Sequence, residues 1–554
     1  MSTEEETTII HGRGISPGLA EGITFLHRDL FKHLDEPVPI NRKDVEQEIG
    51  HLESSTAIIT SDLLKLATRV EQVMDSRLAA VFDAHQMMLN DPGLKNELQA
   101  EIQGKLVNAS SAVRAVFMRW EKRFLLMESQ TAQHKSADMR DISNRLSNAL
   151  DGIKSNPMER LPPGCVLVAS QLLPSDTVFL SQRSTAAVLL EFGRSMSHAA
   201  LFTRALGLPC ISGIKDILEN IPAKVPVLVD ADKGEIVIRP LEERRTRFHS
   251  HLAQRSHEFT ASQVQAREPA ITLDGTTIAV LANVGNADDT ERAMANGADG
   301  VGLYRTEQAY LGRTTPPDTE ELLAEMRRTL HPAGGKPVCV RLLDVGADKQ
   351  LPFLRFLAET NPSLGRRGVR LQLAHPRLLE TQLRAILSLS DDFNVFILIP
   401  MVTLPQDVIT VRETLQRLAA ERGQGKLPPL GAMIETPAAA LSVKAIAPHV
   451  DFLSFGTNDL TQYTFAADRE NAAVEPYFND SDDAIFRLLQ IAHDDAPQLP
   501  AAICGELAGR AAHVHRLLKC GIRTFSVVPP LIPAIKAAIR AERIEQTPLN
   551  RAQP

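Results

Sequence analysis

The chain has 554 residues, with 60 Lys and Arg against 68 Asp and Glu, a net charge of −8, and 44% hydrophobic residues. This is an ordinary soluble composition, and at about 150 residues per domain we expect about three or four domains. No apolar run reaches the roughly 18 to 20 residues that cross a bilayer, and the first residues are acidic and polar. We therefore expect neither membrane insertion nor secretion, and the acidic balance argues against a nucleic-acid partner.

Cysteine is sparse in this chain. The five cysteines are scattered and odd in number, and none forms a CxxC pair. This usage excludes a disulfide framework and gives no sign of a zinc site, so a reducing cytoplasmic location is expected.

The first part of the chain has two alternating patterns. Residues 1–30 are typical of strands and turns, with several glycines in GRGISPGLAEG, whereas apolar spacing of three and four predicts long helices over 31–154, interrupted by Asp91-Pro92-Gly93. Short apolar runs separated by Gly and Pro return over 155–240 and indicate an α/β structure. We predict one discontinuous α/β domain, 1–30 plus 155–240, with an all-helical insertion.

The second part of the chain predicts a barrel. A charged stretch, 241–268, contains few large apolar residues and is expected to be an exposed helical linker. Over 269–554, eight strand-like segments recur, most of them followed by a helical pattern: TIAVLANVG, GVGLYRTE, PVCVRLLDVG, FILIPMV, LGAMIET, DFLSFGTND, AAICGELAG and TFSVVP. This order predicts a (β/α)8 barrel.

Polar residues stand where several of these strands end, which in such a barrel is the mouth of the active site. They are Arg305, Arg341, Asp344, Glu435, Asn458, Asp459 and Cys504. Any one of them is compatible with a structural salt bridge or a turn. Their convergence, with opposite charges, indicates a functional site.

The chemistry of these residue types narrows the ligand. Glu435 and Asp459 offer the oxygen ligands that Mg²⁺ uses, and Arg305, Arg341 and Arg469 can bind phosphate or carboxylate in bidentate fashion. A small, highly anionic substrate is expected. The Cys504 thiol either exchanges a proton with a carbon centre or is an inert buried side chain.

One histidine of the first half also has a suggestive position. His198 follows a Gly-containing turn in EFGRSMSHAALFTRALGLPCISG and begins an amphipathic helical run. Backbone N–H groups and the helix dipole favour an added phosphate there, so His198 is a candidate phosphoryl acceptor.

Several ordered motifs closely resemble enzyme I of the bacterial phosphotransferase system, a member of the PEP-utilising enzyme family. In the barrel these are GVGLYRTE (300–307), DVGADKQLP (344–352), ETPAAA (435–440), DFLSFGTNDLTQYTFAADR (451–469) and CGELAG (504–509). SPGLAEG, FDAHQMMLNDPGL, DMRDISNRL and SHAALFTRALGLP extend the resemblance over nearly the whole chain.

The resemblance implies a phosphoenolpyruvate–protein phosphotransferase. Such an enzyme phosphorylates its own histidine from phosphoenolpyruvate, releases pyruvate, and passes the phosphoryl group to the histidine of HPr or an HPr-like carrier. By position in the motifs, His198 would be phosphorylated and Cys504 would protonate the enolate carbon. Glu435 and Asp459 would hold Mg²⁺, and the substrate would be bound by Arg305, Arg341, Lys349, Asn458 and Arg469.

The resemblance also implies an architecture and its motions. The α/β domain would swivel on the 241–268 linker to bring His198 to the barrel, and the inserted helices, 31–154, would dock the carrier. A homodimer through the barrel is implied by the family alone. Because no N-terminal sensor domain precedes these motifs, the sugar-uptake branch is favoured over the nitrogen-linked branch.

The phosphohistidine segment departs from the family pattern Gly-Gly-x-Thr-Ser-His. Arg194 replaces a glycine and Met196 replaces a threonine. This leaves open a regulatory relative that binds phosphoenolpyruvate and a carrier protein with little turnover. A relative of pyruvate phosphate dikinase or phosphoenolpyruvate synthase would need a further nucleotide-binding domain, and the chain has neither that length nor a Gly-rich phosphate loop.

Overall fold

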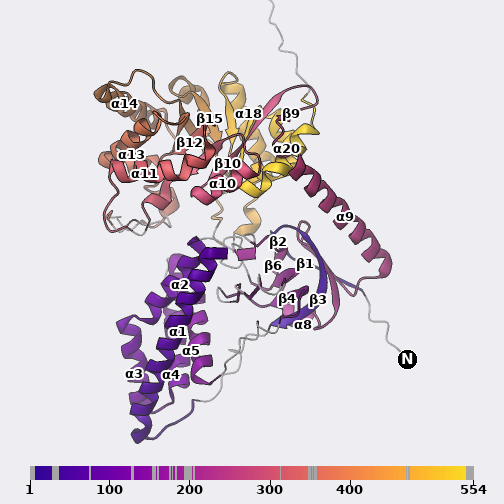
Figure 1. Cartoon of the computed structure of the whole chain (residues 1–554), viewed down its shortest axis with the longest axis vertical. Coiled ribbons are helices and arrows are strands. Elements are labelled where there is room, and N and C mark those ends of the chain that lie inside the picture. Colours follow the sequence, from indigo (N-terminus) through magenta and orange to yellow (C-terminus); the bar gives the residue numbers. More distant parts are fainter. Residues whose placement is uncertain are drawn as a thin grey trace, which may run out of the picture. The chain divides into compact units, whose positions relative to one another are not determined.

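The chain forms two compact units, residues 1–253 and 254–554 (Figure 1). The computed structural model describes residues 7–27, 37–73, 76–126, 130–152, 158, 161–173, 176–177, 179–180, 184–192, 202–203, 206–311, 313–346, 351, 353–354, 359–469, 471 and 474–544. None of the described helices is both long and apolar enough to span a membrane.

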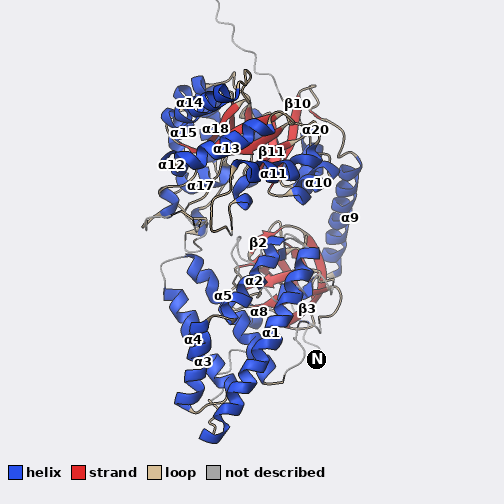
Figure 2. Cartoon of the chain, turned by 60° about the vertical axis from the view of Figure 1, so that its left-hand side comes forward, coloured by secondary structure: helices blue, strands red, loops and turns tan. Residues whose placement is uncertain are grey.

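The first unit contains one mixed sheet, drawn red in Figure 2. Over its described residues the strand order is β1-β8-β7-β3-β4-β5-β6-β2, with parallel pairing from β3 through β6 and antiparallel pairing elsewhere. The strands are β1 (Thr8–His11), β2 (Arg13–Ser16), β3 (Leu19–His27), β4 (Cys165–Ala169), β5 (Ala187–Leu190), β6 (Cys210–Ser212), β7 (Pro226–Asp230) and β8 (Glu235–Ile238). A short helix, α8 (Ile217–Asn220), precedes β7.

Successive side chains of a strand point to opposite faces of a sheet. The central strands of this sheet are apolar and buried along their whole length, so both faces of the sheet are apolar. On β4, Val166 and Val168 pack in one buried cluster, whereas Cys165 and Leu167 pack in another. The glycines of the first strands permit close approach of neighbouring backbones. At Gly14, a Cβ atom would lie 1.8 Å from the carbonyl oxygen of Ala231.

A helical segment separates β3 from β4 in the sequence, although the two strands pair with each other in parallel. Its helices are α1 (Val45–Val73), α2 (Ser76–Leu89), α3 (Pro92–Lys105), α4 (Ala109–Leu126) and α5 (Gln130–Leu150), preceded by a 3-10 turn, η2 (Arg42–Asp44). They pack around Leu63, Phe82 and Phe117. The Asp91-Pro92-Gly93 break starts α3, where Asp91 accepts a hydrogen bond from the Leu94 N–H at 2.9 Å.

The boundary between the two units falls within the helix α9 (Glu242–Val264). In the first unit, the Glu21 carboxylate accepts hydrogen bonds from Arg245 at 2.8 Å and pairs with His249 at 2.7 Å, both on the first half of α9. In the second unit, Arg540 donates hydrogen bonds to the carbonyls of Gln265 and Glu268, just beyond the end of α9. Each end of the helix is therefore attached within its own unit.

The second unit is a closed parallel barrel. Its strands, taken from the described residues, are β10 (Thr277–Val284), β11 (Val301–Arg305), β12 (Val338–Arg341), β13 (Val395–Val402), β14 (Leu430–Ile434), β15 (Phe452–Phe455), β16 (Ala501–Ile503) and β17 (Thr524–Val527). They pair in chain order, and β10 pairs with both β11 and β17, which closes the barrel. A short strand, β9 (Ala270–Ile271), runs antiparallel to β10. All eight predicted strand segments form barrel strands, and the predicted fold class is confirmed.

Helices follow most of these strands and cover the outside of the barrel. They are α10 (Ala287–Ala295), α11 (Thr319–Leu330), α12 (Val369–Ala374), α13 (Pro376–Leu389), α14 (Pro405–Arg422), α15 (Pro437–Leu441), α16 (Val443–Ile446), α17 (Thr457–Thr464), α18 (Asp483–Asp495), α19 (Val514–Lys519) and α20 (Ile532–Arg540). Short 3-10 turns include η4 (Thr306–Ala309), η6 (Pro362–Leu364) and η9 (Glu506–Gly509). A capping box starts α11, where Asp318 and Glu321 each accept the other's backbone N–H.

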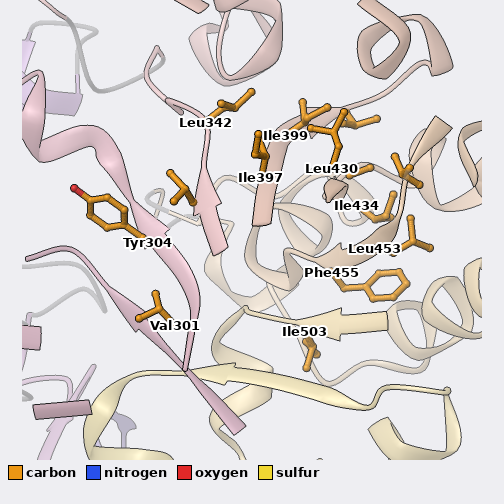
Figure 3. Packing of buried hydrophobic residues seen from close by; sticks show 14 of the residues in the cluster. Val301, Tyr304, Leu342, Ile397, Ile399, Leu430, Ile434, Leu453, Phe455 and Ile503 are labelled. Carbon is orange, nitrogen blue, oxygen red and sulfur yellow. The ribbon is translucent and has the colours of Figure 1, made fainter. Parts of the chain in front are cut away.

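The barrel strands have two kinds of neighbours, which fixes where polar side chains point. One side of each strand packs against the helices in a large buried cluster, part of which, including Tyr304 and Ile397, is shown in Figure 3. The alternate side chains fill the inside of the barrel, among them Leu303, Cys339 and Met433. Side chains two residues further along the same strands belong to this inner face, at the carboxyl end of the barrel.

Candidate active site

The inner face of the barrel becomes polar at the carboxyl ends of the strands. Two residues beyond Leu303, Cys339 and Met433 are Arg305, Arg341 and Glu435. Asn458 and Asp459 lie on the first turn of α17, directly after β15, and Cys504 follows β16. Since the strands are parallel, these ends meet at one mouth of the barrel, as predicted.

A chain of alternating charges crosses this mouth. Arg341 donates a hydrogen bond to Glu307 at 2.7 Å and another to Asp344 at 3.1 Å. Arg367 donates to both Asp344 oxygens, at 3.0 and 3.4 Å, and to both Asp459 oxygens, at 3.0 and 3.3 Å. All five side chains are at least nine-tenths buried. Burial lowers the pKa of each guanidinium, but the neighbouring carboxylates raise it by more. The net pKa of each arginine is therefore above its ordinary value, and both arginines stay charged.

Arg367 and Glu307 are functional candidates that the sequence analysis missed. Arg367 is not at a strand end; it lies between η6 and α12. The signal that could have located it is a pair of arginines enclosed by Gly365 and Gly368. Gly368 has a φ of +55°, and a Cβ there would lie 2.8 Å from the Met401 Cβ, so only glycine brings this loop into the mouth.

Glu435 is held by an unusual stretch of β13. The pairing of β13 with β14 shifts register between Ile399 and Val402, and Met401 has a left-handed φ of +56°. In this conformation the Met401 N–H donates to the Glu435 carboxylate at 2.7 Å. Strained backbone of this kind persists where the surrounding structure fixes it, often at functional sites.

The acidity of Glu435 is strongly perturbed. Burial raises the pKa of its carboxyl to about 8, and the negative charges of Asp459 and Asp344 contribute to the rise. The two predicted metal ligands are therefore close enough to repel one another. A cation between them would relieve that repulsion.

These acids fit a hard divalent cation that keeps substrate or water oxygens among its ligands. Within the described part of the chain, no group of three or more His, Cys, Asp or Glu side chains has the arrangement of a complete protein cage. Mg²⁺ is typically bound by one or two carboxylates with its other positions filled by substrate and water. Two carboxylates, Glu435 and Asp459, meet that requirement.

Cys504 is buried, and its thiol has polar neighbours. The sulfur lies 3.4 Å from the Phe455 carbonyl oxygen and 3.5 Å from the Ser454 hydroxyl oxygen. Burial raises the pKa of the thiol to about 11. The thiol therefore retains its proton at neutral pH, which a proton donor requires.

The backbone around Cys504 is fixed from both sides. Asn283 donates to the Cys504 carbonyl at 3.2 Å and accepts a hydrogen bond from Ser526 at 2.7 Å. Asn458 accepts a hydrogen bond from the Glu506 N–H at 2.9 Å. Asn458, predicted to bind substrate, thus also contacts the loop that follows Cys504.

The other predicted residues are distributed as follows. Arg305 is exposed at the mouth, and Arg469 is half-buried in the loop after α17, where its N–H donates to Gln462 at 3.3 Å. His198 and Lys349, together with the altered Arg194 and Met196, lie outside the described residues.

Family models of PEP-utilising enzymes match three consecutive parts of the chain. The N-terminal model matches residues 11–135, the mobile-domain model 161–234, and the PEP-binding-domain model 260–544. The last of these alone spans the whole barrel.

Curated relatives match the chain almost from end to end. Phosphoenolpyruvate-protein phosphotransferase of Geobacillus stearothermophilus is 32% identical over 560 residues, covering 98% of this chain and 95% of the relative. The protein of the same description from Haloferax volcanii is 34% identical, covering 96% and 94%, and that from Bacillus subtilis is 31% identical, covering 95% and 93%. The chain belongs to the PEP-utilising enzyme family, among the phosphoenolpyruvate-protein phosphotransferases known as enzyme I.

Proposed function

We propose that this chain transfers the phosphoryl group of phosphoenolpyruvate to His198, releasing pyruvate, and then to a histidine of HPr or an HPr-like carrier protein. The observation that supports this most directly is the barrel mouth, where arginines, paired acids and a protonated thiol meet at the ends of adjacent strands. These are the groups needed for an anionic substrate whose product is protonated at carbon.

Arg341 and Arg367 are proposed to recognise the substrate. Each presents a planar guanidinium that matches phosphate or carboxylate oxygens in bidentate fashion. Glu307, Asp344 and Asp459 hold them in fixed orientations before the substrate arrives. Arg305, Lys349, Asn458 and Arg469 complete the proposed substrate-binding set, as the motifs imply.

Glu435 and Asp459 are proposed to hold Mg²⁺. When bound, the cation would neutralise charge on the substrate oxygens, which is the main requirement of phosphoryl transfer. Arg341 and Arg367 would place the phosphoryl group for in-line attack by His198.

The atoms of the proposed reaction balance without a further reactant. A His198 nitrogen forms a bond to phosphorus while the bond from phosphorus to the enol oxygen breaks, leaving the enolate of pyruvate. The Cys504 S–H bond then breaks as a C–H bond forms at the enolate methylene carbon. The products are phosphohistidine, pyruvate and a thiolate. The thiolate regains its proton from solvent, and the phosphorylated ring releases its remaining N–H proton to solvent, so no net proton is consumed.

In the proposed reaction, His198 of residues 1–253 serves two sites in turn, the barrel of residues 254–554 and the carrier protein, so the first unit would have to move between them. We propose that the α9 segment serves as the pivot. The helices α1–α5 are proposed to dock the carrier. Met87 on α2 is 77% exposed, and Ile58 and Leu64 on α1 are each 57% exposed, which suits an apolar protein contact.

Two further properties are proposed, the first from the sparse cysteines and the second from the family resemblance. They are a cytoplasmic location and a homodimer formed through the barrel. Analytical ultracentrifugation of the full chain tests the second, because a mass of one chain across the working concentration range would reject it.

Label transfer from radioactive phosphoenolpyruvate tests the proposed reaction. With Mg²⁺ present, we expect an acid-labile phosphohistidine on the native chain and on His51→Ala, which alters an exposed histidine of α1, but none on His198→Ala. If phosphoenolpyruvate binds but no chain is labelled, the altered Arg194 and Met196 have disabled transfer, and the regulatory function replaces this proposal.

A further inference from the structure

A glutamine outside the barrel mouth is bonded to the backbone that bears Arg341. Gln382 lies on α13 and is 1% exposed. Its side-chain oxygen accepts a hydrogen bond from the Leu343 N–H at 2.9 Å, two residues after Arg341. Its side-chain nitrogen donates to the Thr306 hydroxyl at 3.0 Å. One amide therefore joins the segments that follow β11 and β12.

The Thr306 hydroxyl closes this connection. It donates to the carbonyl oxygen of Arg341 at 3.2 Å. Gln382 thus reaches the Arg341 backbone by two routes, directly through Leu343 and indirectly through Thr306. The residues of both routes are buried, so water cannot easily take the place of a lost hydrogen bond, and breaking either bond would leave a buried polar group unsatisfied.

The next residue along the chain extends the network to the Arg341 guanidinium. Glu307 accepts from the Arg341 guanidinium at 2.7 Å and from the Asp344 N–H at 3.1 Å. Because Thr306 and Glu307 are adjacent in η4, the hydrogen bond from Gln382 to Thr306 also restrains the carboxylate that orients Arg341.

A second glutamine binds the same segment from another helix. Gln372 on α12 donates to the Leu343 carbonyl at 2.6 Å, so both backbone groups of Leu343 are bonded to side-chain amides. At Gln382 an amide is required because it donates and accepts at once and adds no buried charge. A carboxylate at this position could not donate to Thr306, and an apolar side chain would lose both hydrogen bonds.

We propose that Gln382 is a positioning residue for phosphoenolpyruvate binding, which acts by fixing the Arg341 backbone and, through Thr306 and Glu307, the direction of its guanidinium. This rests on the proposed function, in which Arg341 binds the substrate. Without Gln382 the Arg341 guanidinium would be less ordered, and substrate binding would have to order it. Replacement of Gln382 should therefore weaken the affinity for phosphoenolpyruvate. Chemistry on bound substrate changes much less, because Gln382 touches no reacting group.

Steady-state transfer from phosphoenolpyruvate to HPr with Gln382→Met, a volume-conserving change, tests this. We expect KM for phosphoenolpyruvate to rise about tenfold, while kcat stays within about threefold of the native value. In a His198→Ala background, which prevents turnover, calorimetric titration with phosphoenolpyruvate and Mg²⁺ should give the same rise in Kd. Gln382→Glu, which retains the acceptor for Leu343, provides a second variant if Gln382→Met does not fold.

Thr329→Val is the matched control for stability. Thr329 is fully buried on the outer helix α11, and its hydroxyl donates to Glu325 at 3.4 Å, so this change removes a hydrogen bond of an outer helix and leaves the bonds of Gln382 in place. At a similar fall in Tm, its KM should remain native. A Gln382 variant with native KM and Kd, or one that loses only kcat, would overturn the inference. Arg341→Gln separates the two proposals: if it leaves Kd unchanged, the assignment of Arg341 itself fails.

Discussion

The guanidinium of Arg367 donates hydrogen bonds to both carboxylate oxygens of Asp459, at 3.0 and 3.3 Å. It also contacts both oxygens of Asp344. One buried arginine is therefore the counter-ion of two acids, and one of these acids is a proposed metal ligand. This arrangement links the stability of the barrel to the proposed metal site.

Arg367→Gln should destabilise the barrel unit at neutral pH. Removing one partner of a buried ion network leaves uncompensated carboxylates, so the free energy of unfolding should fall by about 3 kcal/mol. Mg²⁺ should restore part of this loss by supplying positive charge near Asp459. Urea unfolding with and without Mg²⁺ measures both effects.

Arg370→Gln provides the control for that experiment. Arg370 lies three residues away, and among the described residues it donates to two neutral oxygens, the Leu364 carbonyl at 3.2 Å and the Thr403 hydroxyl at 3.1 Å. Its replacement should lower the free energy of unfolding by about 1 kcal/mol, and Mg²⁺ should not change this loss. Equal losses of stability in the two variants would show that Arg367 does not stabilise the barrel by compensating the charges of Asp344 and Asp459.

Cys504→Ala should slow pyruvate formation by at least about a hundredfold and leave phosphoenolpyruvate binding intact. The thiol retains its proton because burial raises its pKa to about 11, and alanine has no proton to give. Rapid-quench measurement of pyruvate, with binding measured separately, distinguishes the two steps. Cys339→Ala, at another buried cysteine of the same inner cluster, should react normally. Loss of binding with an unchanged chemical step would refute the role of Cys504.

Glu435→Gln and Asp459→Asn should each abolish the increase in Tm that Mg²⁺ gives the native chain. Each variant removes one of the two carboxylates available to the cation, and stabilisation by a ligand follows its affinity. Glu325→Gln, on the outer helix α11, should keep the full increase. A native response in both mouth variants would place the metal elsewhere.

Asp176 should make the first unit less stable as pH rises from about 4 to about 6. Its carboxyl is 4% exposed, and burial raises its pKa to about 6, against the opposing effect of His27 at 3.9 Å. Since the folded-state pKa exceeds the ordinary value, the stabilising contribution is complete below about pH 4 and is lost as pH rises through about 6.

Asp176→Asn should remove this pH dependence. The free energy of unfolding of the variant minus that of the native chain should be more favourable at pH 7 than at pH 4, by up to about 3 kcal/mol. Unfolding by urea at several pH values provides the measurement, and Asp62→Asn, which alters an exposed carboxylate of α1, should show no such gain. A constant difference between native chain and Asp176→Asn at all pH values would contradict the expectation.

The sequence was sufficient to predict the barrel strands and the polar residues at their ends. Buried strands gave continuous apolar runs such as FILIPMV, and each change to a polar residue marked a strand end. Arg305, Arg341 and Glu435 were predictable because a parallel barrel brings all carboxyl ends of its strands to one mouth. Asp344 was noticed for the same reason, although no role was assigned to it.

Arg367, Glu307 and Gln382 could not be assigned in this way. Arg367 bonds Asp459, which lies 92 residues further along the chain, and Gln382 bonds Thr306, which lies 76 residues earlier. Local patterns give the type of an element and the face that a residue occupies, but not its partner on a distant element. Arg367 lies in a loop and Gln382 on an outer helix, where the same residue types are usually exposed.

The sequence by itself determined the order of the elements, the fold class and the family, because periodicity and motifs are properties of consecutive residues. Only the tertiary structure decided which charges pair, that Met401 adopts a left-handed backbone to reach Glu435, and that burial keeps Cys504 protonated. Those properties depend on distance and on exclusion of water. Both arise when β12, β13, β14 and β16 close around one mouth.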